Sequence, residues 1–295
     1  MTRPRGFLLD YQPVRKTVAL LEQVDAVLVE YRDYLPLTLR QVFYRLVGAH
    51  GFEKTEQAYG RLCEAMSNAR RGRRVSFDAI RDDGLTTLAP DAFSGMPDFW
   101  QAVLETANSY RLRRLDGQAR ELEVWVEAGG MASQIEKAVG EFGVTVYSSG
   151  GFDSLTVKHA AARRIAVRER KTVVLHVGDY DPSGLALFEA AQEDVSAFVA
   201  GMAGVVPEFV RVAVTPAQIA VYGLPGSPPK RTDRRGVWQD GDETVQAEAL
   251  PPDVLAEEVR YAVSVRLDLE QVARVVAEEA RQRERLHVEL ERYPA

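Results

Sequence analysis

From Glu121 to Val214 the chain alternates short apolar segments with segments of helical periodicity, and this alternation restricts the fold more than any other feature. Strands that alternate with helices are typical of a parallel sheet with helices covering its faces. The sequence therefore predicts an α/β domain over residues 121–252. The expected strands are 121–127, 144–148, 172–178 and 208–214, and the expected helices are 132–142, 153–169 and 183–200.

Two carboxylates directly follow the third expected strand, in V-V-L-H-V-G-D-Y-D-P-S-G. Alternate residues of an extended chain point to the same side, so Asp179 and Asp181 are expected to share a face while Tyr180 points away. Open α/β sheets bind ligands at the carboxyl ends of their strands, and carboxylate oxygens beside a charged substrate suit Mg²⁺. The other interpretation is that Asp181 only caps the helix that begins at Pro182.

A third carboxylate strengthens the metal interpretation. Glu127 ends the alternating segment E-L-E-V-W-V-E and precedes Ala128-Gly129-Gly130 and the helix expected at 132–142. Two strand–turn–helix units that each end in an acid predict one Mg²⁺ site, formed by Glu127, Asp179 and Asp181.

The overall composition is that of an ordinary soluble globular protein, with 46% hydrophobic and 27% charged residues. The N-terminus lacks the apolar core of a secretory signal, and the chain has no long uninterrupted apolar segment. Cys63 is the single cysteine, which excludes an intrachain disulfide and favours a reducing cytoplasm. One cysteine and four histidines also make a structural zinc site improbable.

The net charge of −6 is unevenly distributed. Residues 1–120 carry 18 Lys and Arg against 15 Asp and Glu, whereas residues 121–295 carry 19 against 28. An acidic metal-binding half joined to a mildly basic half is compatible with chemistry on DNA, because Mg²⁺ and local basic patches matter more than the total charge.

The N-terminal third is predicted to be helical, with an arm at 1–34, helices at 39–47 and 54–69, and a short extended or helix-starting piece after the basic turn. Thr38 and Gln41 have the spacing of a capping box at the start of the second helix. Helices followed by a basic turn and a short extended piece predict a winged-helix DNA-binding domain over residues 35–95. A connecting helix at 96–120, a long Pro- and Gly-rich loop at 215–252 and C-terminal helices within 253–295 complete the expected organisation.

Arg40 and Tyr44 lie four residues apart in T-L-R-Q-V-F-Y and therefore share one helix face. A tyrosine hydroxyl is a poor nucleophile near neutral pH because its ordinary pKa is about 10. A neighbouring guanidinium favours the phenolate and can also hold a phosphate oxygen. The alternative interpretation packs Phe43 and Tyr44 in the helical core and leaves Arg40 solvated.

Together, these motifs resemble the A subunit of topoisomerase VI and its meiotic double-strand-break relative, particularly the compact stand-alone A-subunit homologues. The likeness covers roughly residues 35–83 and 121–200. It implies a winged-helix domain followed by a Toprim Rossmann-like domain. It also implies that Tyr44 of R-Q-V-F-Y attacks DNA, with Arg40 beside it, and that Glu127, Asp179 and Asp181 hold Mg²⁺.

The resemblance further implies a homodimer in which the tyrosine of one protomer meets the acids of the other, cutting double-stranded DNA. The chain carries no ATPase region, so strand passage would need a separate ATPase subunit of the B type. Two other hypotheses remain open. One is a hydrolytic Toprim nuclease, of the kind found in plasmid-defence systems, in which water replaces Tyr44. The other is a DNA-binding adaptor with degenerate acids, against which the complete acid set counts.

Several further residues are candidates for DNA contact. The best of these are Arg70, Arg71, Arg73 and Arg74, since neutralising phosphates releases counterions; the alternative is a solvated helix end. Lys230 and the neighbouring Arg231, Arg234 and Arg235 of the long loop are further candidates, and Ser149-Gly150-Gly151 is either a close approach for the DNA backbone or a plain turn. His159 and His176 are interpreted as structural, and Glu248 has no expected role.

Overall fold

The computed structural model of the chain describes residues 8, 10–81, 92–148, 155–228 and 243–292. Its N-terminal part contains α1 (Arg15–Glu30), α2 (Leu39–His50) and α3 (Glu56–Arg71). The short 3-10 helix η1 (Arg32–Tyr34) follows α1. The capping box predicted for α2 is present, with the Thr38 hydroxyl accepting from the Gln41 amide and the Gln41 side chain accepting from the Thr38 amide. The three predicted helices are therefore confirmed.

The extended piece after the basic turn is a 3-10 helix, η2 (Phe77–Ala79), followed by the two-residue strand β2 (Ile80–Arg81). This strand pairs in parallel with β1 (Leu37–Thr38), which directly precedes α2. Over residues 10–81, the N-terminal unit thus consists of three α-helices closed by one short strand pair. Residues 82–91 of the predicted winged-helix domain lie outside the described residues.

The second part is built on a parallel sheet with the strand order β4-β3-β5-β6. Its strands are β3 (Glu121–Val126), β4 (Thr145–Ser148), β5 (Thr172–Val177) and β6 (Glu208–Ala213), which confirms the predicted α/β class. Every residue of the two central strands, β3 and β5, is buried. This explains why their sequences read as nearly continuous apolar runs, because both of their faces are covered.

The helices that connect the strands lie on opposite faces of the sheet. The helices α6 (Leu155–Ala166) and α7 (Pro182–Gly201) share a core with Trp125 and Val174 on one face. On the other face, α5 (Ala132–Val139) and α9 (Pro252–Ser264) pack over Val124 and Leu175. The connection from β3 runs one way to β4, and the connection from β5 runs the other way to β6, so right-handed crossovers place their helices on opposite faces. The gap between β3 and β5 is therefore the topological switch point, where open α/β sheets form a crevice.

Two sequence predictions about connecting segments are wrong. The connecting helix α4 (Met96–Asn108) ends well before residue 120, because the backbone beyond it bonds to α10 (Leu269–Leu290) instead of continuing its own ladder. The Leu112 amide donates to Glu279 Oε2 at 3.0 Å. The expected loop at 215–252 contains a helix, α8 (Pro216–Tyr222), whose T-P-A-Q start is a capping box.

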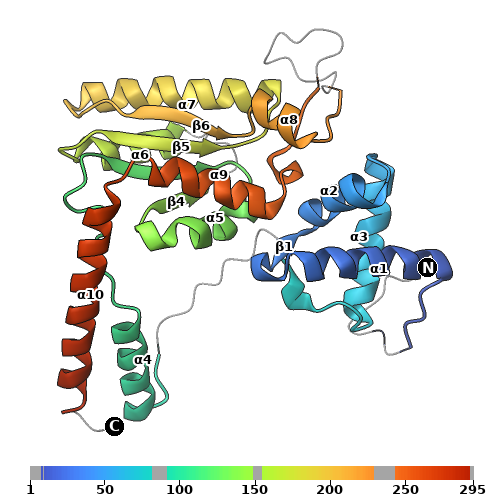
Figure 1. Cartoon of the computed structure of the whole chain (residues 1–295), viewed down its shortest axis with the longest axis horizontal. Coiled ribbons are helices and arrows are strands. Elements are labelled where there is room, and N and C mark those ends of the chain that lie inside the picture. Colours follow the sequence, from blue (N-terminus) through green and yellow to red (C-terminus); the bar gives the residue numbers. More distant parts are fainter. Residues whose placement is uncertain (1–7, 9, 82–91, 149–154, 229–242, 293–295) are drawn as a thin grey trace.

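The C-terminal helices do not form a unit of their own. Whereas α9 belongs to the layer over the sheet, α10 extends away from the sheet and packs against α4, so that the two helices project together from the α/β part (Figure 1). Within the described part of the chain, no helix combines the length and the apolar character needed to cross a bilayer.

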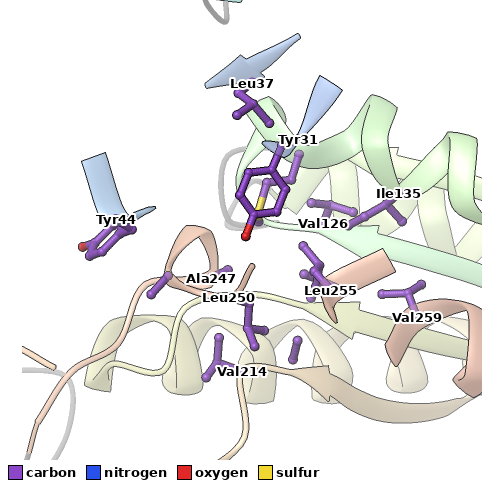
Figure 2. Close-up of a cluster of buried hydrophobic side chains, with 14 of the residues drawn as sticks. Tyr31, Leu37, Tyr44, Val126, Ile135, Val214, Ala247, Leu250, Leu255 and Val259 are labelled. Atoms are coloured by element: carbon purple, nitrogen blue, oxygen red, sulfur yellow. The ribbon is translucent and has the colours of Figure 1, made fainter. Parts of the chain in front are cut away.

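One apolar cluster runs without a break from the N-terminal helices to the sheet. Figure 2 shows Tyr31, Leu37 and Tyr44 of the N-terminal unit in the same cluster as Val126 and Leu255 of the sheet layer. The segment 244–250, which we call the strap, contributes Ala247 and Leu250 between the two parts. This shared core brings α2 toward the carboxyl edge of the sheet.

Candidate active site

The three predicted acids lie at the switch point. Glu127 directly follows β3, and its amide donates to the Val177 carbonyl at the end of β5. The Asp179 amide donates to Glu127 Oε2 at 3.3 Å, which couples the two strand ends. The structure therefore brings Glu127 and Asp179 together on adjacent strands, as the strand–turn–helix pattern predicts.

Asp181 has the capping role that the sequence left open. Its Oδ1 accepts from the Gly184 amide at 2.6 Å at the start of α7, with Pro182 in the first helical turn. This hydrogen bond uses only Oδ1, so Asp181 can cap the helix and still offer its other carboxylate oxygen to a metal ion.

Two glycines make room for these carboxylates. A Cβ atom at Gly178 would stand 2.4 Å from Glu127 Oε2, which is closer than real Cβ contacts. A Cβ at Gly184 would stand 3.3 Å from Asp181 Oδ1 and 3.4 Å from Glu127 Oε2. The Asp179 carbonyl oxygen would stand closer still to a Cβ at Gly184, at 2.8 Å, and the His176 ring would stand 2.5 Å from a Cβ at Gly178. Crowding by the acids together with these neighbours therefore accounts for the two glycines.

The electrostatics of this cluster show an excess of negative charge. Burial and the neighbouring Asp179 carboxylate raise the pKa of Glu127 to about 7. Burial also raises the pKa of Asp179, with the Asp181 charge acting in the same direction. Carboxylates that repel one another in this way would be stabilised in their charged form by a cation.

Arg211, on β6, is a basic residue of this site that sequence analysis missed. Its guanidinium donates to the Gly178 carbonyl at 2.9 Å and also to the Asp179 carbonyl, so it holds the turn that carries the aspartates. Burial lowers the pKa of Arg211, whereas the Glu127 and Asp179 charges raise it. An arginine inside the apolar strand F-V-R-V-A was a visible signal, because a charged group that is partly removed from water needs partners.

The chemistry of the donor set fits a hard divalent cation, because the acids supply carboxylate oxygens at a crevice. Among the described residues, however, no group of three His, Cys, Asp or Glu side chains already stands at ligand spacing. Magnesium is usually held by one or two carboxylates together with water and substrate phosphates, so such a group is not a requirement. A metal role for Glu127, Asp179 and Asp181 therefore remains a prediction.

Tyr44 and Arg40 approach the strap from α2. The Tyr44 hydroxyl donates to Gln246 Oε1 at 2.7 Å, and Arg40 Nη1 donates to the same oxygen at 2.8 Å. The prediction that they share one helix face is confirmed. Tyr44 is 5% exposed and packs edge-on against Phe43, so it is buried as the alternative interpretation expected, yet its hydroxyl is bonded across the domain boundary.

Burial dominates the acidity of Tyr44. Burial raises its pKa to about 12, although the Arg40 guanidinium acts to lower it and the Glu248 carboxylate acts to raise it. Arg40 therefore has the effect that the sequence predicts, but desolvation outweighs it. Lys54 lies over the Tyr44 ring, with Nζ 5.4 Å from the centroid, and burial lowers the pKa of this amine to about 8.

The predicted DNA-contacting arginines lie away from the strap, at the end of α3. Arg70 and Arg71 are in the last turn of the helix, and Arg73 and Arg74 follow it as exposed residues. The Arg70 guanidinium stands 4.6 Å from the centroid of the Phe77 ring, so it also has a packing role. The remaining candidates, Lys230, Arg231, Arg234, Arg235 and the segment 149–151, lie outside the described residues.

The two histidines interpreted as structural lie in the sheet layer. His176 is buried on β5 and stacks on Phe188, with ring centroids 4.1 Å apart. Burial lowers its pKa to about 3. His159 packs edge-on against Phe198.

Gln246 and the buried Glu248 could not be assigned from the sequence, because nothing in V-Q-A-E-A-L marks a site. Gln246 matters because it bonds to Arg40 and Tyr44, some two hundred positions away, and Glu248 because its charge acts to raise the pKa of Tyr44. Comparison with protein-family models, curated proteins and solved structures finds no significant match to this chain.

Proposed function

We propose that this chain is a Mg²⁺-dependent DNA-cleaving transesterase, with a winged-helix DNA-binding unit before a Toprim-type catalytic sheet. The observation that carries the proposal is the meeting of two chemical features across the domain boundary. Tyr44 and Arg40 bond to Gln246, and the next residue of the strap, Ala247, donates its amide to Asp179 Oδ1 at 2.8 Å. A hydroxyl nucleophile, a cation and an acid cluster at a sheet switch point are the groups that phosphodiester transfer needs.

In the proposed reaction, the Tyr44 oxygen loses its proton and attacks the phosphorus of a phosphodiester. A bond forms between the Tyr44 oxygen and phosphorus, and the bond from phosphorus to the 3′ oxygen breaks. Tyr44 gives its proton to water, and the 3′ oxygen takes a proton from water and leaves as a hydroxyl. The phosphate stays on the 5′ end as a phosphotyrosyl ester, so the bond energy is kept for resealing. Bound at Glu127, Asp179 and Asp181, Mg²⁺ would neutralise charge on the phosphate and the leaving oxygen.

The chain's own residues would prepare the nucleophile. With a pKa of about 12, Tyr44 holds its proton firmly near neutral pH, so attack requires nearby positive charge. Arg40 is exposed beside it and can turn from Gln246 to a phosphate oxygen. We further propose that the exposed arginines after α3 contact phosphates, that the protein acts in the cytoplasm as a homodimer on double-stranded DNA, and that any ATP-driven step needs a separate B-type ATPase subunit.

A second candidate function is hydrolytic cleavage of DNA by the same acids, with water as the nucleophile. The high pKa and the burial of Tyr44 favour this alternative. In that case Tyr44 would be a packing residue whose hydroxyl is held by Gln246.

The two candidates differ in a covalent product. We expect incubation with supercoiled DNA and Mg²⁺, followed by rapid denaturation, to leave protein attached to 5′ ends. Tyr44→Phe keeps the ring packing and should lose both the adduct and the breaks by several orders of magnitude, far beyond the loss of one hydrogen bond of ~1 kcal/mol. Breaks made at the wild-type rate by Tyr44→Phe, without an adduct, would establish the hydrolytic function instead.

A further inference from the structure

A row of three side chains lies behind the acids, on the face of the sheet that α7 covers. Trp125, His176 and Arg211 form this row, because they are paired in register on β3, β5 and β6. Residues at one register position of neighbouring strands point to the same face of a sheet. The His176 ring stacks on Phe188 of α7, which places the row on the α7 side.

Two members of the row reach the strand ends that carry the acids. Arg211 donates to the Gly178 and Asp179 carbonyls and so holds the aspartate turn. His176 approaches Glu127 beside Gly178. A Cβ atom at Gly178 would stand 2.5 Å from His176 Cε1 and 3.1 Å from His176 Nε2, and it would also clash with Glu127 Oε2. The Nε2 edge of the imidazole and the Glu127 carboxylate are therefore close neighbours.

A small cavity is shared by His176 and Glu127. Its volume is about 10 Å³, and it is lined by these two residues, Gly184, Trp125 and apolar side chains of α7. A cavity of about 10–15 Å³ can hold one water molecule where at least two polar partners are present. The Glu127 carboxylate and the imidazole are two such partners, so this cavity suits a single bridging water.

The surroundings of the imidazole decide which of its nitrogens carries the proton. His176 is 3% exposed, and its buried Nδ1 has no hydrogen-bond partner among the described residues. With a pKa of about 3, the ring is neutral and carries one N–H. A buried N–H needs an acceptor, so this proton belongs on Nε2 and Nδ1 is the bare nitrogen. The donor of His176 thus lies on the edge next to Glu127.

We infer that His176 is a positioning residue for Glu127, donating from Nε2 to a buried water that in turn donates to the carboxylate. This inference rests on the proposed function, in which Glu127 helps to hold Mg²⁺. A hydrogen bond to a metal-binding carboxylate fixes its orientation and favours its charged form. Within the row, Arg211 holds the aspartate turn and His176 holds the glutamate.

Magnesium binding without DNA tests this role separately from cleavage. A Gln amide nitrogen reaches the place of Nε2, whereas an Asn amide nitrogen, one methylene shorter, lies near Nδ1. In calorimetric titrations, His176→Asn should therefore weaken Mg²⁺ binding about tenfold to a hundredfold, and His176→Gln should recover most of the affinity. The matched control is His159→Phe, which changes the other histidine that packs on a phenylalanine and should bind Mg²⁺ like the wild type. Wild-type affinity in His176→Asn, or equal losses in the Asn and Gln variants, would overturn the inference.

The proton position is measured on the wild-type protein, so this test does not depend on the folding of a His176 variant. Imidazole ¹⁵N spectra should place the proton on Nε2, and Glu127→Ala should shift the Nε2 resonances of His176 while those of His159 stay unchanged. A proton on Nδ1, or Nε2 resonances that do not respond to Glu127→Ala, would overturn the inference. If these resonances respond but the wild-type protein binds no Mg²⁺ and forms no adduct, the proposed function fails and the hydrogen-bonded bridge stands.

Discussion

Two glutamates on one strand show how surroundings decide what a carboxylate does. Glu123, within β3, is fully buried and accepts two hydrogen bonds from Arg164 at 2.9 Å. Arg168 pairs with it at 2.8 Å and the Trp125 indole donates at 2.8 Å. Glu127, four residues on, is half-buried and has two other carboxylates as neighbours.

The pKa values of these glutamates move in opposite directions. Although burial raises the pKa of Glu123, its bonds to Arg164 outweigh this and hold it below the usual range. Burial and the Asp179 charge raise the pKa of Glu127. The comparison teaches that a buried acid with every lone pair occupied is structural, whereas an acid gathered with other acids at a strand end is available for a ligand.

The largest expected effect is the loss of stability in Glu123→Gln. Removing the charge leaves Arg164 and Arg168 with an incomplete partner, and breaking a buried pair costs about 3–5 kcal/mol of unfolding free energy. Chemical denaturation of the variant measures this loss. Glu53→Gln is the matched control, because its pair with Arg61 is exposed and should be worth less than about 1 kcal/mol. Equal losses of unfolding free energy in Glu123→Gln and Glu53→Gln would contradict the structural role of Glu123.

Glu127→Gln should show the reverse pattern. We expect DNA cleavage to fall about a hundredfold to a thousandfold, because charge stabilisation at the phosphate is lost. Stability without divalent metal should rise, because the change relieves repulsion between carboxylates. Cleavage kinetics and thermal melts measure the two quantities. Glu193→Gln, an exposed change on α7, is the control, and a Glu127→Gln protein of wild-type activity would refute the acid assignment.

The pH dependence of stability separates the two glutamates by sign. The folded pKa of Glu127, about 7, lies above its ordinary value of 4.5. Its contribution to stability is therefore complete below pH 4.5 and is lost as the pH rises toward 7. The folded pKa of Glu123 lies below 4.5, so its contribution is present above that pH and is lost as the pH falls through the folded value. For each glutamate, we measure the difference in unfolding free energy between the wild type and its Gln variant, without metal, across this pH range. This difference should fall with rising pH for Glu127 and increase with rising pH for Glu123.

The smallest expected effect concerns the positive charges at the end of α3. Replacing Arg71, Arg73 and Arg74 with Gln should weaken DNA binding regardless of sequence. The slope of log affinity against log salt should become shallower by about 0.9 for each phosphate that the variant no longer neutralises. Arg70 is kept because its stacking on Phe77 supports the fold. An unchanged slope in a binding titration would return this cluster to the role of a solvated helix end.

Local sequence determined much of this molecule. Short apolar runs located the central strands, which are buried on both faces, and period-3.6 patterns located the helices, each of which buries one face. The capping box before α2, the cap at Asp181 and the acids at the ends of β3 and β5 were also visible, because caps and strand ends depend on neighbours within a few residues.

Tertiary structure decided the rest. It ended α4 at Asn108, because polar side chains of α10 bind the following backbone, and it placed α9 on the sheet. Above all, it brought the strap to two distant residues, with Gln246 bonded to Tyr44 and Ala247 bonded to Asp179. Hydrogen bonds between residues some two hundred positions apart leave no periodic trace in the sequence, since they depend on how whole layers pack. Local sequence patterns thus identified the candidate reactive residues, and tertiary packing determined which of them are in contact.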